Sequence, residues 1–267
     1  MRVTFMASSL ERLSFALTLY FAASSHKRSG LMGVGGRRCI RAVTLDLDDT
    51  LWPCEPTLRR AERLGLEWLT ERVPEVIAPW SVDRLRERRM AIHAARPDLR
   101  HDFRKIRRLA LEEVFRAAGA DDAQSAQIIE GALDVYMTAR NDVELYPEVR
   151  ACLERLSAQY RIASLSNGNA CLVQIGLDHL FHAMIAAHTH GASKPDADVF
   201  HIACRELGCA PEEVVHLGDD IELDVRGARA AGLHAVWINR ASHSWPGEDV
   251  PDTVADLEEF ECWLTQS

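Results

Sequence analysis

Short apolar runs alternate with helical stripes in two parts of the chain, residues 41–52 and 146–267. The short runs have the length and composition of buried strands, and the stripes have the period of a helix. Strands are expected over residues 41–47, 161–165, 184–187, 214–217 and 235–238, and helices over residues 148–159, 170–177, 197–207, 223–231 and 254–264. Because strands that alternate with helices form parallel βαβ units, these residues predict an α/β domain with a doubly wound parallel sheet.

Residues 53–145 contain no convincing strand, and their apolar positions repeat with the period of a helix. Leu58, Leu64, Leu66 and Leu69 form one such stripe. Helices are expected over residues 55–72, 81–95, 100–118 and 123–140, with prolines and a glycine turn between them. Helices joined by short links are typical of a small bundle, so we expect residues 53–145 to be a helical insertion between the first two strands.

Residues 1–40 follow neither pattern. An apolar run over residues 13–23 comes after Arg12, and a basic, glycine-rich stretch follows it. The run is too short to span a bilayer comfortably. We expect a flexible extension outside the fold; a signal peptide, and a helix that meets a membrane or a partner, are the alternatives.

Composition narrows the class of protein. The net charge of −9 over 267 residues argues against nucleic acid as a partner. The seven cysteines are scattered and form no CxxC pair, which is typical of reduced thiols in a cytoplasmic protein without a membrane partner. Lysine is rare beside arginine, so Lys194, one of three lysines, is a candidate for a specific role.

Polar side chains gather where the predicted strands end. In chain order the candidates are Asp46, Asp48, Ser166, Asn167, Gly168, Lys194, Asp219, Asp220 and Asp224. The carboxyl ends of parallel strands lie at one edge of a sheet, so we expect these residues to converge there. Asp46 and Asp48 are two residues apart and share a face of their strand. Carboxylates this close need a cation or a proton between them, which points to a divalent metal, an acid/base couple, or both.

Together these groups are suited to phosphoryl transfer to a carboxylate. We expect Mg²⁺ to be bound by Asp46 and Asp219 and to neutralise the charge of a phosphate ester. Asp46 then attacks phosphorus, while Asp48 protonates the leaving oxygen and later takes a proton from water. Lys194, the Ser166 hydroxyl and backbone amides next to it hold the phosphoryl oxygens.

The arrangement resembles the haloacid dehalogenase superfamily of phosphatases. The residues that match its four motifs are Asp46, Asp48 and Thr50 in the first, Ser166 in the second, Lys194 in the third, and Gly218, Asp219 and Asp224 in the fourth. The resemblance implies a Rossmann-like core formed by residues 41–52 and 146–267, an α-helical cap, and Mg²⁺. It also implies that Asp46 is the nucleophile, and that the backbone carbonyl of Asp48 is a metal ligand. The family's dehalogenases lack an acid at the position of Asp48, which favours a phosphatase.

Residues 166–170, 190–195 and 218–225 also resemble bacterial riboflavin-pathway phosphatases, as does His101 with the aspartate after it. This implies FMN or 5-amino-6-(5-phosphoribitylamino)uracil as the small phosphorylated metabolite, and a place in riboflavin biosynthesis. A sugar-phosphate or nucleotide monophosphatase of broad selectivity is the alternative. A binding protein without catalysis is a third possibility, against which the intact set of catalytic residues argues.

Three further residues are candidates for substrate contact. Trp52 could stack on a substrate ring or pack at the hinge of the insertion, and His101 could contact substrate or pack within the insertion. Arg104 belongs to an arginine-rich stretch that is either solvated or guides an anion. Behind the metal ligands we expect Asp220 and Asp224, although Asp220 could instead cap the helix that follows it.

Overall fold

The computed structural model describes residues 39–99 and 101–266, except the side chains of residues 122 and 123. The extension expected over residues 1–40 therefore lies outside the described residues, apart from its last two positions. Within the described part of the chain, no helix is both long enough and apolar enough to cross a membrane.

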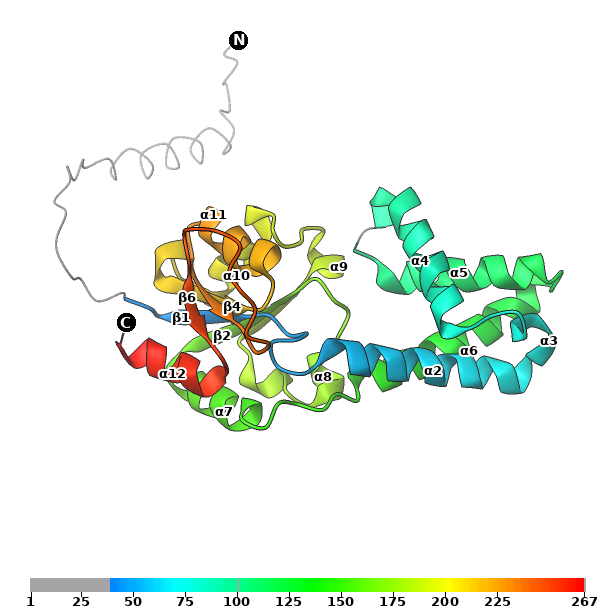
Figure 1. Ribbon diagram of the computed structural model, residues 1–267, viewed down its shortest axis with the longest axis horizontal. Helices are drawn as coiled ribbons and strands as arrows, with labels where there is room; N and C mark the ends of the chain where they lie inside the picture. The colour runs from blue at the N-terminus through cyan, green and yellow to red at the C-terminus, as the bar shows by residue number, and fades with distance from the viewer. Residues whose placement is uncertain (1–38, 100, 267) are drawn as a thin grey trace, which may run out of the picture. The chain divides into compact units, whose positions relative to one another are not determined.

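A parallel sheet of six strands forms the centre of the fold, in the order β3-β2-β1-β4-β5-β6 (Figure 1). The strands are β1 (Ala42–Leu45), β2 (Arg161–Ser166), β3 (Ala183–Ala186), β4 (Val214–Gly218), β5 (His234–Ile238) and β6 (Asp252–Val254). β1 lies between β2 and β4, with Leu45 opposite Ser164 on one side and Leu217 on the other. The carboxyl ends of these three strands therefore meet at one edge of the sheet.

Helices cover both faces of the sheet. The longer ones are α7 (Val149–Gln159), α10 (Ala197–Leu207) and α12 (Leu257–Gln266); the shorter elements are α8 (Leu172–Ile175), η2 (Asp178–Leu180), α9 (Ala187–His190), η3 (Pro211–Glu213), η4 (Ile221–Arg226) and α11 (Gly227–Ala230). Val43 and Leu45 pack into the core that α7 and α12 cover, whereas Ala42 packs into the core under α10 and α11. This alternation explains why the strand is apolar at nearly every position.

The end of the chain differs from the expectation. The closing helix, expected over residues 254–264, begins only at Leu257, and residues 252–254 form the sixth strand, β6. Three residues are too few for a strand pattern to be recognised. The helix expected over residues 170–177 is reduced to α8, because Gly176 adopts a left-handed conformation (φ 78°) that ends it.

The residues between β1 and β2 are helical, as expected. We call residues 54–141 the helical insertion; it contains α2 (Cys54–Arg72), α3 (Pro74–Ile77), α4 (Val82–Ala95), η1 (Pro97–Leu99), α5 (Phe103–Ala117) and α6 (Asp122–Asn141). Helices α2 and α6 lie side by side (Figure 1). A Cβ at Gly131 would lie 2.5 Å from the Trp68 ring, so a glycine is needed for this close approach. Helix α3, four residues long, was not expected.

Candidate active site

Three carboxylates converge at the carboxyl edge of the sheet. Asp46 directly follows β1, Asp219 follows β4, and Asp224 lies in η4. Each offers an oxygen, and these oxygens all lie within 4.8 Å of one another. The backbone N–H of Asp46 donates to the Leu217 carbonyl at 2.9 Å, which fixes the start of its loop against β4. Asp224 was expected behind the metal ligands, but its carboxylate belongs to the same cluster.

Lys194 lies within this cluster and is almost completely buried. Its ammonium donates to Asp224 Oδ1 at 2.6 Å and also contacts Asp46 Oδ1. Although burial opposes it, the charges of these two carboxylates raise the pKa of Lys194 above its usual value. The lysine is therefore a fixed positive charge beside Asp46.

The side chain of Asn167 positions the loop that carries Lys194. Its Nδ2 donates to the Lys194 carbonyl, and its Oδ1 accepts the Lys194 backbone N–H, both at 2.9 Å. Asn167 was expected in the phosphate-binding group. Its side-chain amide makes these two bonds, and its part in phosphate binding stays a prediction.

The cluster holds more negative charge than Lys194 neutralises. Burial, and the charges of Asp224 and Asp219, raise the pKa of Asp46 well above its usual value. Burial, and the charges of Asp224 and Asp49, raise the pKa of Asp219 to about 7. Asp224 behaves differently: although burial opposes it, Lys194 and His216 lower its pKa. A divalent cation would offset the repulsion, and carboxylate oxygens are ligands that Mg²⁺ prefers, so the donor set fits such an ion.

The Asp48 carboxylate is held by two side chains. The indole N–H of Trp52 donates to its Oδ1 at 2.8 Å, and Nη2 of Arg140 donates to both oxygens, at 2.7 and 2.6 Å. Trp52 is 0% exposed and packs in the core, which favours the second of the two alternatives given for it, packing over stacking on a substrate ring. The contribution of Arg140, from the end of α6, was missed from the sequence.

Strand β2 ends at Ser166, and Gly168 lies in the turn that follows; we call these residues the Ser166 turn. The Ser166 hydroxyl is buried and accepts the backbone N–H of Gly168 at 3.0 Å. A Cβ at Gly168 would lie 2.8 Å from Asp48 Oδ2 and 3.3 Å from the Ser166 hydroxyl. The glycine therefore lets Asp48 lie directly beside this turn.

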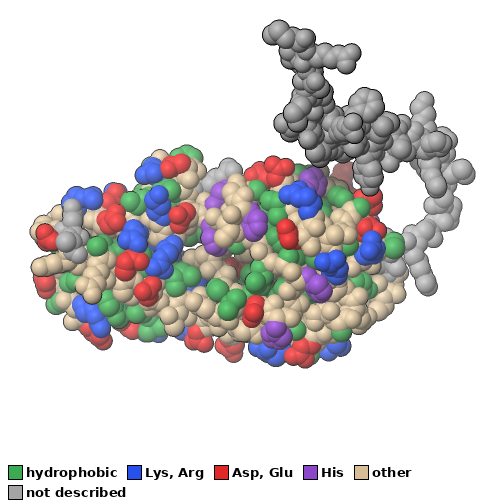
Figure 2. Space-filling view, turned by 180° about the vertical axis from the view of Figure 1, so that it is seen from behind, with side chains coloured by type: hydrophobic (Ala, Val, Ile, Leu, Met, Phe, Trp, Pro, Cys, Tyr) green, Lys and Arg blue, Asp and Glu red, His purple; other side chains and the backbone are tan. Residues whose placement is uncertain are grey.

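A cavity of about 490 Å³ extends from Ser166 to the start of α5, where His101 and Arg104 line it. Figure 2 shows a hollow between the helical insertion and the sheet, with several histidine side chains beside it. Apolar residues that the sequence did not single out form much of its wall: Leu47, Met137, Leu172, Val173, Met184 and Ile185. The cavity is in the size range of small-molecule sites, about 300–1,000 Å³.

The side chains of two other expected site residues, Arg104 and Asp220, make hydrogen bonds within the chain. Nη2 of Arg104 donates to Glu130 at 2.9 Å and to Asp134 at 3.0 Å, so this guanidinium is tied to α6 at the edge of the cavity. The Asp220 carboxylate accepts the N–H groups of Glu222 and Leu223, each at 2.8 Å. It caps η4, which is the alternative given for it above.

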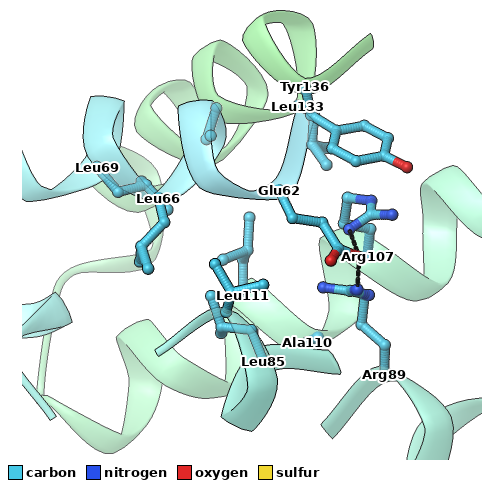
Figure 3. A pocket seen from close by; sticks show the side chains of 13 residues that line it. Glu62, Leu66, Leu69, Leu85, Arg89, Arg107, Ala110, Leu111, Leu133 and Tyr136 are labelled. Atoms are coloured by element: carbon cyan, nitrogen blue, oxygen red, sulfur yellow. Dashed lines mark hydrogen bonds and ion pairs between the residues drawn. The ribbon is translucent and has the colours of Figure 1, made fainter. Parts of the chain in front are cut away.

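Part of the arginine-rich stretch is buried inside the helical insertion. Figure 3 shows the Glu62 carboxylate between the guanidinium groups of Arg89 and Arg107, beside a small cavity of about 40 Å³. Arg86 also donates to Glu62, at 2.8 Å. The Cζ atom of Arg107 lies 3.5 Å from the centre of the Tyr136 ring. Burial, and the charge of Arg107, lower the pKa of Arg89 to about 10. These arginines surround one buried carboxylate inside the insertion, so the arginine-rich stretch is not entirely a solvated face.

A parallel α/β sheet with an acidic cluster, a buried lysine and a serine at its carboxyl edge is the arrangement of an α/β enzyme whose site lies at the ends of its strands. Residues 40–232 match the family model of the haloacid dehalogenase-like hydrolases. The chain belongs to this family.

Similar proteins include several phosphatases. The chain is 30% identical over 199 residues to the 5-amino-6-(5-phospho-D-ribitylamino)uracil phosphatase YigB of Escherichia coli (strain K12), covering 74% of this chain and 83% of that protein. It is 27% identical over 226 residues to the glyceraldehyde 3-phosphate phosphatase of Methanopyrus kandleri, covering 82% of this chain and 92% of that protein. With its family, these similarities identify the chain as a phosphatase.

Solved structures of the family share the fold. A 2-haloacid dehalogenase from Pseudomonas syringae pv. Tomato DC3000 superposes with a TM-score of 0.80 at 31% identity, covering 85% of this chain and 99% of that chain. A HAD phosphatase from Thermococcus onnurineus superposes with a TM-score of 0.60 at 26% identity, covering 84% and 98%. The Rossmann-like core with its helical insertion is thus the fold of these hydrolases.

Proposed function

We propose that this chain is a Mg²⁺-dependent phosphomonoesterase in which Asp46 is the nucleophile, with FMN or 5-amino-6-(5-phosphoribitylamino)uracil as its substrate. The observation that carries the proposal is the contact of buried Lys194 with both Asp46 and Asp224, inside a cluster of three carboxylates. One fixed cation beside an excess of negative charge is an arrangement for binding a metal together with a phosphate dianion. Residues 53–145 are the cap in this proposal, and residues 41–52 and 146–267 are the core.

Asp46 and Asp219 would hold Mg²⁺, with the Asp48 backbone carbonyl. Bound there, the ion supplies charge neutralisation for the phosphoryl group and for the nucleophile. Lys194 and the Ser166 turn bind the phosphoryl oxygens, so that the substrate presents phosphorus to Asp46.

The reaction then divides into two displacements. Asp46 attacks phosphorus, the bond to the leaving oxygen breaks, and Asp48 gives that oxygen a proton. In the second displacement Asp48 takes a proton from water, which attacks phosphorus and releases phosphate from Asp46. Asp48 lies beside the Ser166 turn, which supports this role.

The substrate class rests on the cavity and on one relative. The cavity joins the Ser166 turn to His101 and has mostly apolar walls, which suits a ring-bearing leaving group. The similarity to the ribitylaminouracil phosphate phosphatase at 30% identity supports the same class. The glyceraldehyde 3-phosphate phosphatase among the relatives supports the alternative, a broader monophosphatase.

The test is a panel of phosphate esters with and without Mg²⁺. We expect Mg²⁺-dependent hydrolysis of p-nitrophenyl phosphate, higher kcat/KM for FMN or the ribitylaminouracil phosphate than for sugar phosphates, and no turnover by Asp46→Asn. Equal values across the panel would establish the broader activity. Full activity of Asp46→Asn would rule out Asp46 as the nucleophile.

A haloacid dehalogenase is the second candidate, because a structure of that name superposes with a TM-score of 0.80. Asp48 argues against it, since halide leaves without a proton and a dehalogenase needs no acid there. Chloride release from L-2-chloropropionate tests this directly. We expect none, and release that depends on Asp46 but not on Mg²⁺ would favour the dehalogenase.

A further inference from the structure

Arg140 connects the helical insertion to the proposed acid/base residue. It lies in the last turn of α6, and its side chain is 1% exposed. Its Nη2 is within hydrogen-bond distance of both oxygens of Asp48, at 2.7 and 2.6 Å, across 92 residues of sequence. The indole of Trp52 and the thiol of Cys54 also hydrogen-bond this carboxylate, but Arg140 brings a positive charge to it.

The Asp48–Arg140 pair lies at the phosphoryl-binding turn. A Cβ built on Gly168 would be 2.8 Å from Asp48 Oδ2, 3.3 Å from the Ser166 hydroxyl and 3.7 Å from Arg140 Nη2. These three side chains therefore surround one backbone position. A leaving oxygen bound at this turn would be next to the Asp48 carboxylate.

The environment of Arg140 is not that of an ion pair selected for stability. Its Nε and Nη1 are buried and have no hydrogen-bond partner among the described residues. Leaving donors of a buried guanidinium unpaired is unfavourable, and a well-packed apolar side chain there would often be at least as stable. A residue kept at such a cost is a candidate for function.

Arg140 is also not needed to attach the end of α6 to the core. The next residue, Asn141, accepts the backbone N–H of Cys171 at 2.8 Å and donates to Gln174 Oε1 at 2.6 Å. This connection involves no charged group. The ion pair to Asp48 is thus additional to the attachment.

We propose that Arg140 is a positioning residue that holds the Asp48 carboxylate beside the leaving oxygen. The inference rests on the proposed phosphatase mechanism, and Arg140 acts only through Asp48. As the bond between phosphorus and the leaving oxygen breaks, its electron pair stays on that oxygen and takes the proton that one oxygen of Asp48 carries, while Arg140 donates to the other oxygen. The helical insertion therefore supplies a part of the chemistry as well as a wall of the substrate cavity.

The experiment compares two leaving groups by kcat/KM, which reports the steps up to leaving-group release. p-Nitrophenolate leaves without a proton, whereas the alkoxide of the alkyl phosphate that the wild type hydrolyses fastest needs one. We expect Arg140→Met to lower kcat/KM for the alkyl ester by about 10- to 100-fold, and for p-nitrophenyl phosphate by less than about threefold. Asp48→Asn should show the same selectivity.

Three controls make the result decisive. Arg63→Met removes an exposed arginine that pairs with Glu67 on α2, and should leave kcat/KM unchanged for both esters. If Arg140→Met does not fold, Arg140→Lys is used instead; it keeps the charge, and should show the same selective loss by a smaller factor. The double variant Asp48→Asn/Arg140→Met should be no slower than Asp48→Asn alone, because Arg140 acts through Asp48.

Equal losses for both esters, or no loss for either, would overturn the role of Arg140. A further loss in the double variant would mean that Arg140 contacts the substrate itself, which also contradicts the inference. The proposed function is judged separately, by the wild-type substrate panel with and without Mg²⁺ and by Asp46→Asn, neither of which depends on Arg140.

Discussion

The buried Glu62 cluster allows a quantitative prediction for the stability of the helical insertion. The Glu62 side chain is 5% exposed, and it lies 2.8 Å from Arg86, within contact of Arg89 and 3.8 Å from Arg107. Glu62→Gln keeps the shape of the side chain but removes the negative charge that all three arginines contact. Removing one partner of a buried ion pair costs about 3–5 kcal/mol, because the remaining charges stay buried.

The measurement is the melting temperature by differential scanning calorimetry. At about 2–4 °C per kcal/mol for a chain of this size, Glu62→Gln should melt about 6–20 °C below the wild type. Glu67→Gln is the matched control on the same helix, because Glu67 pairs with Arg63 at 2.7 Å while both side chains are more than half exposed. Exposed pairs contribute about 0–1 kcal/mol. Equal shifts for the two variants would refute the argument from burial.

Three other predictions concern the site. The pKa of Asp219 is raised to about 7, so below that pH protons compete with Mg²⁺ for its carboxylate. The affinity for Mg²⁺ measured by calorimetry should therefore rise from pH 6 to pH 8, and binding at pH 6 should release a proton; an affinity independent of pH would contradict this. Gly168→Ala should lower kcat/KM about 10²-fold, because its Cβ would displace Asp48; unchanged kinetics would contradict the geometry. Met184→Glu should raise KM for a ring-bearing phosphate ester, since Met184 is 47% exposed and lines the cavity; an unchanged KM would place the substrate elsewhere.

The long elements were predictable because their patterns repeat. Helices α2 and α6 each extend over several turns, and the apolar stripe of each is visible in the sequence. Strand β6 and helix α3 contain three and four residues, too few to show a period. Their formation depends on neighbours in the sheet and in the insertion, which local sequence does not reveal.

The site could be predicted where topology alone brings residues together. Asp46 and Asp219 each follow a strand and Ser166 ends one, so a parallel sheet places them at one edge. Arg140 follows no strand: it is a charged residue in the last turn of a helix, where a solvated arginine is common. Its contact with Asp48 depends on how the insertion packs on the core. The burial of Trp52 likewise comes from tertiary packing.

The most direct test of the central claim is to trap the phosphoryl group on Asp46. Wild-type protein is quenched with borohydride during steady turnover of saturating p-nitrophenyl phosphate with Mg²⁺, and its peptides are analysed by mass spectrometry. Borohydride reduces an acyl phosphate to an alcohol, so we predict reduction at residue 46 that disappears without Mg²⁺ and in Asp46→Asn. Reduction at a different carboxylate, or steady turnover with no reduced residue, would contradict the account.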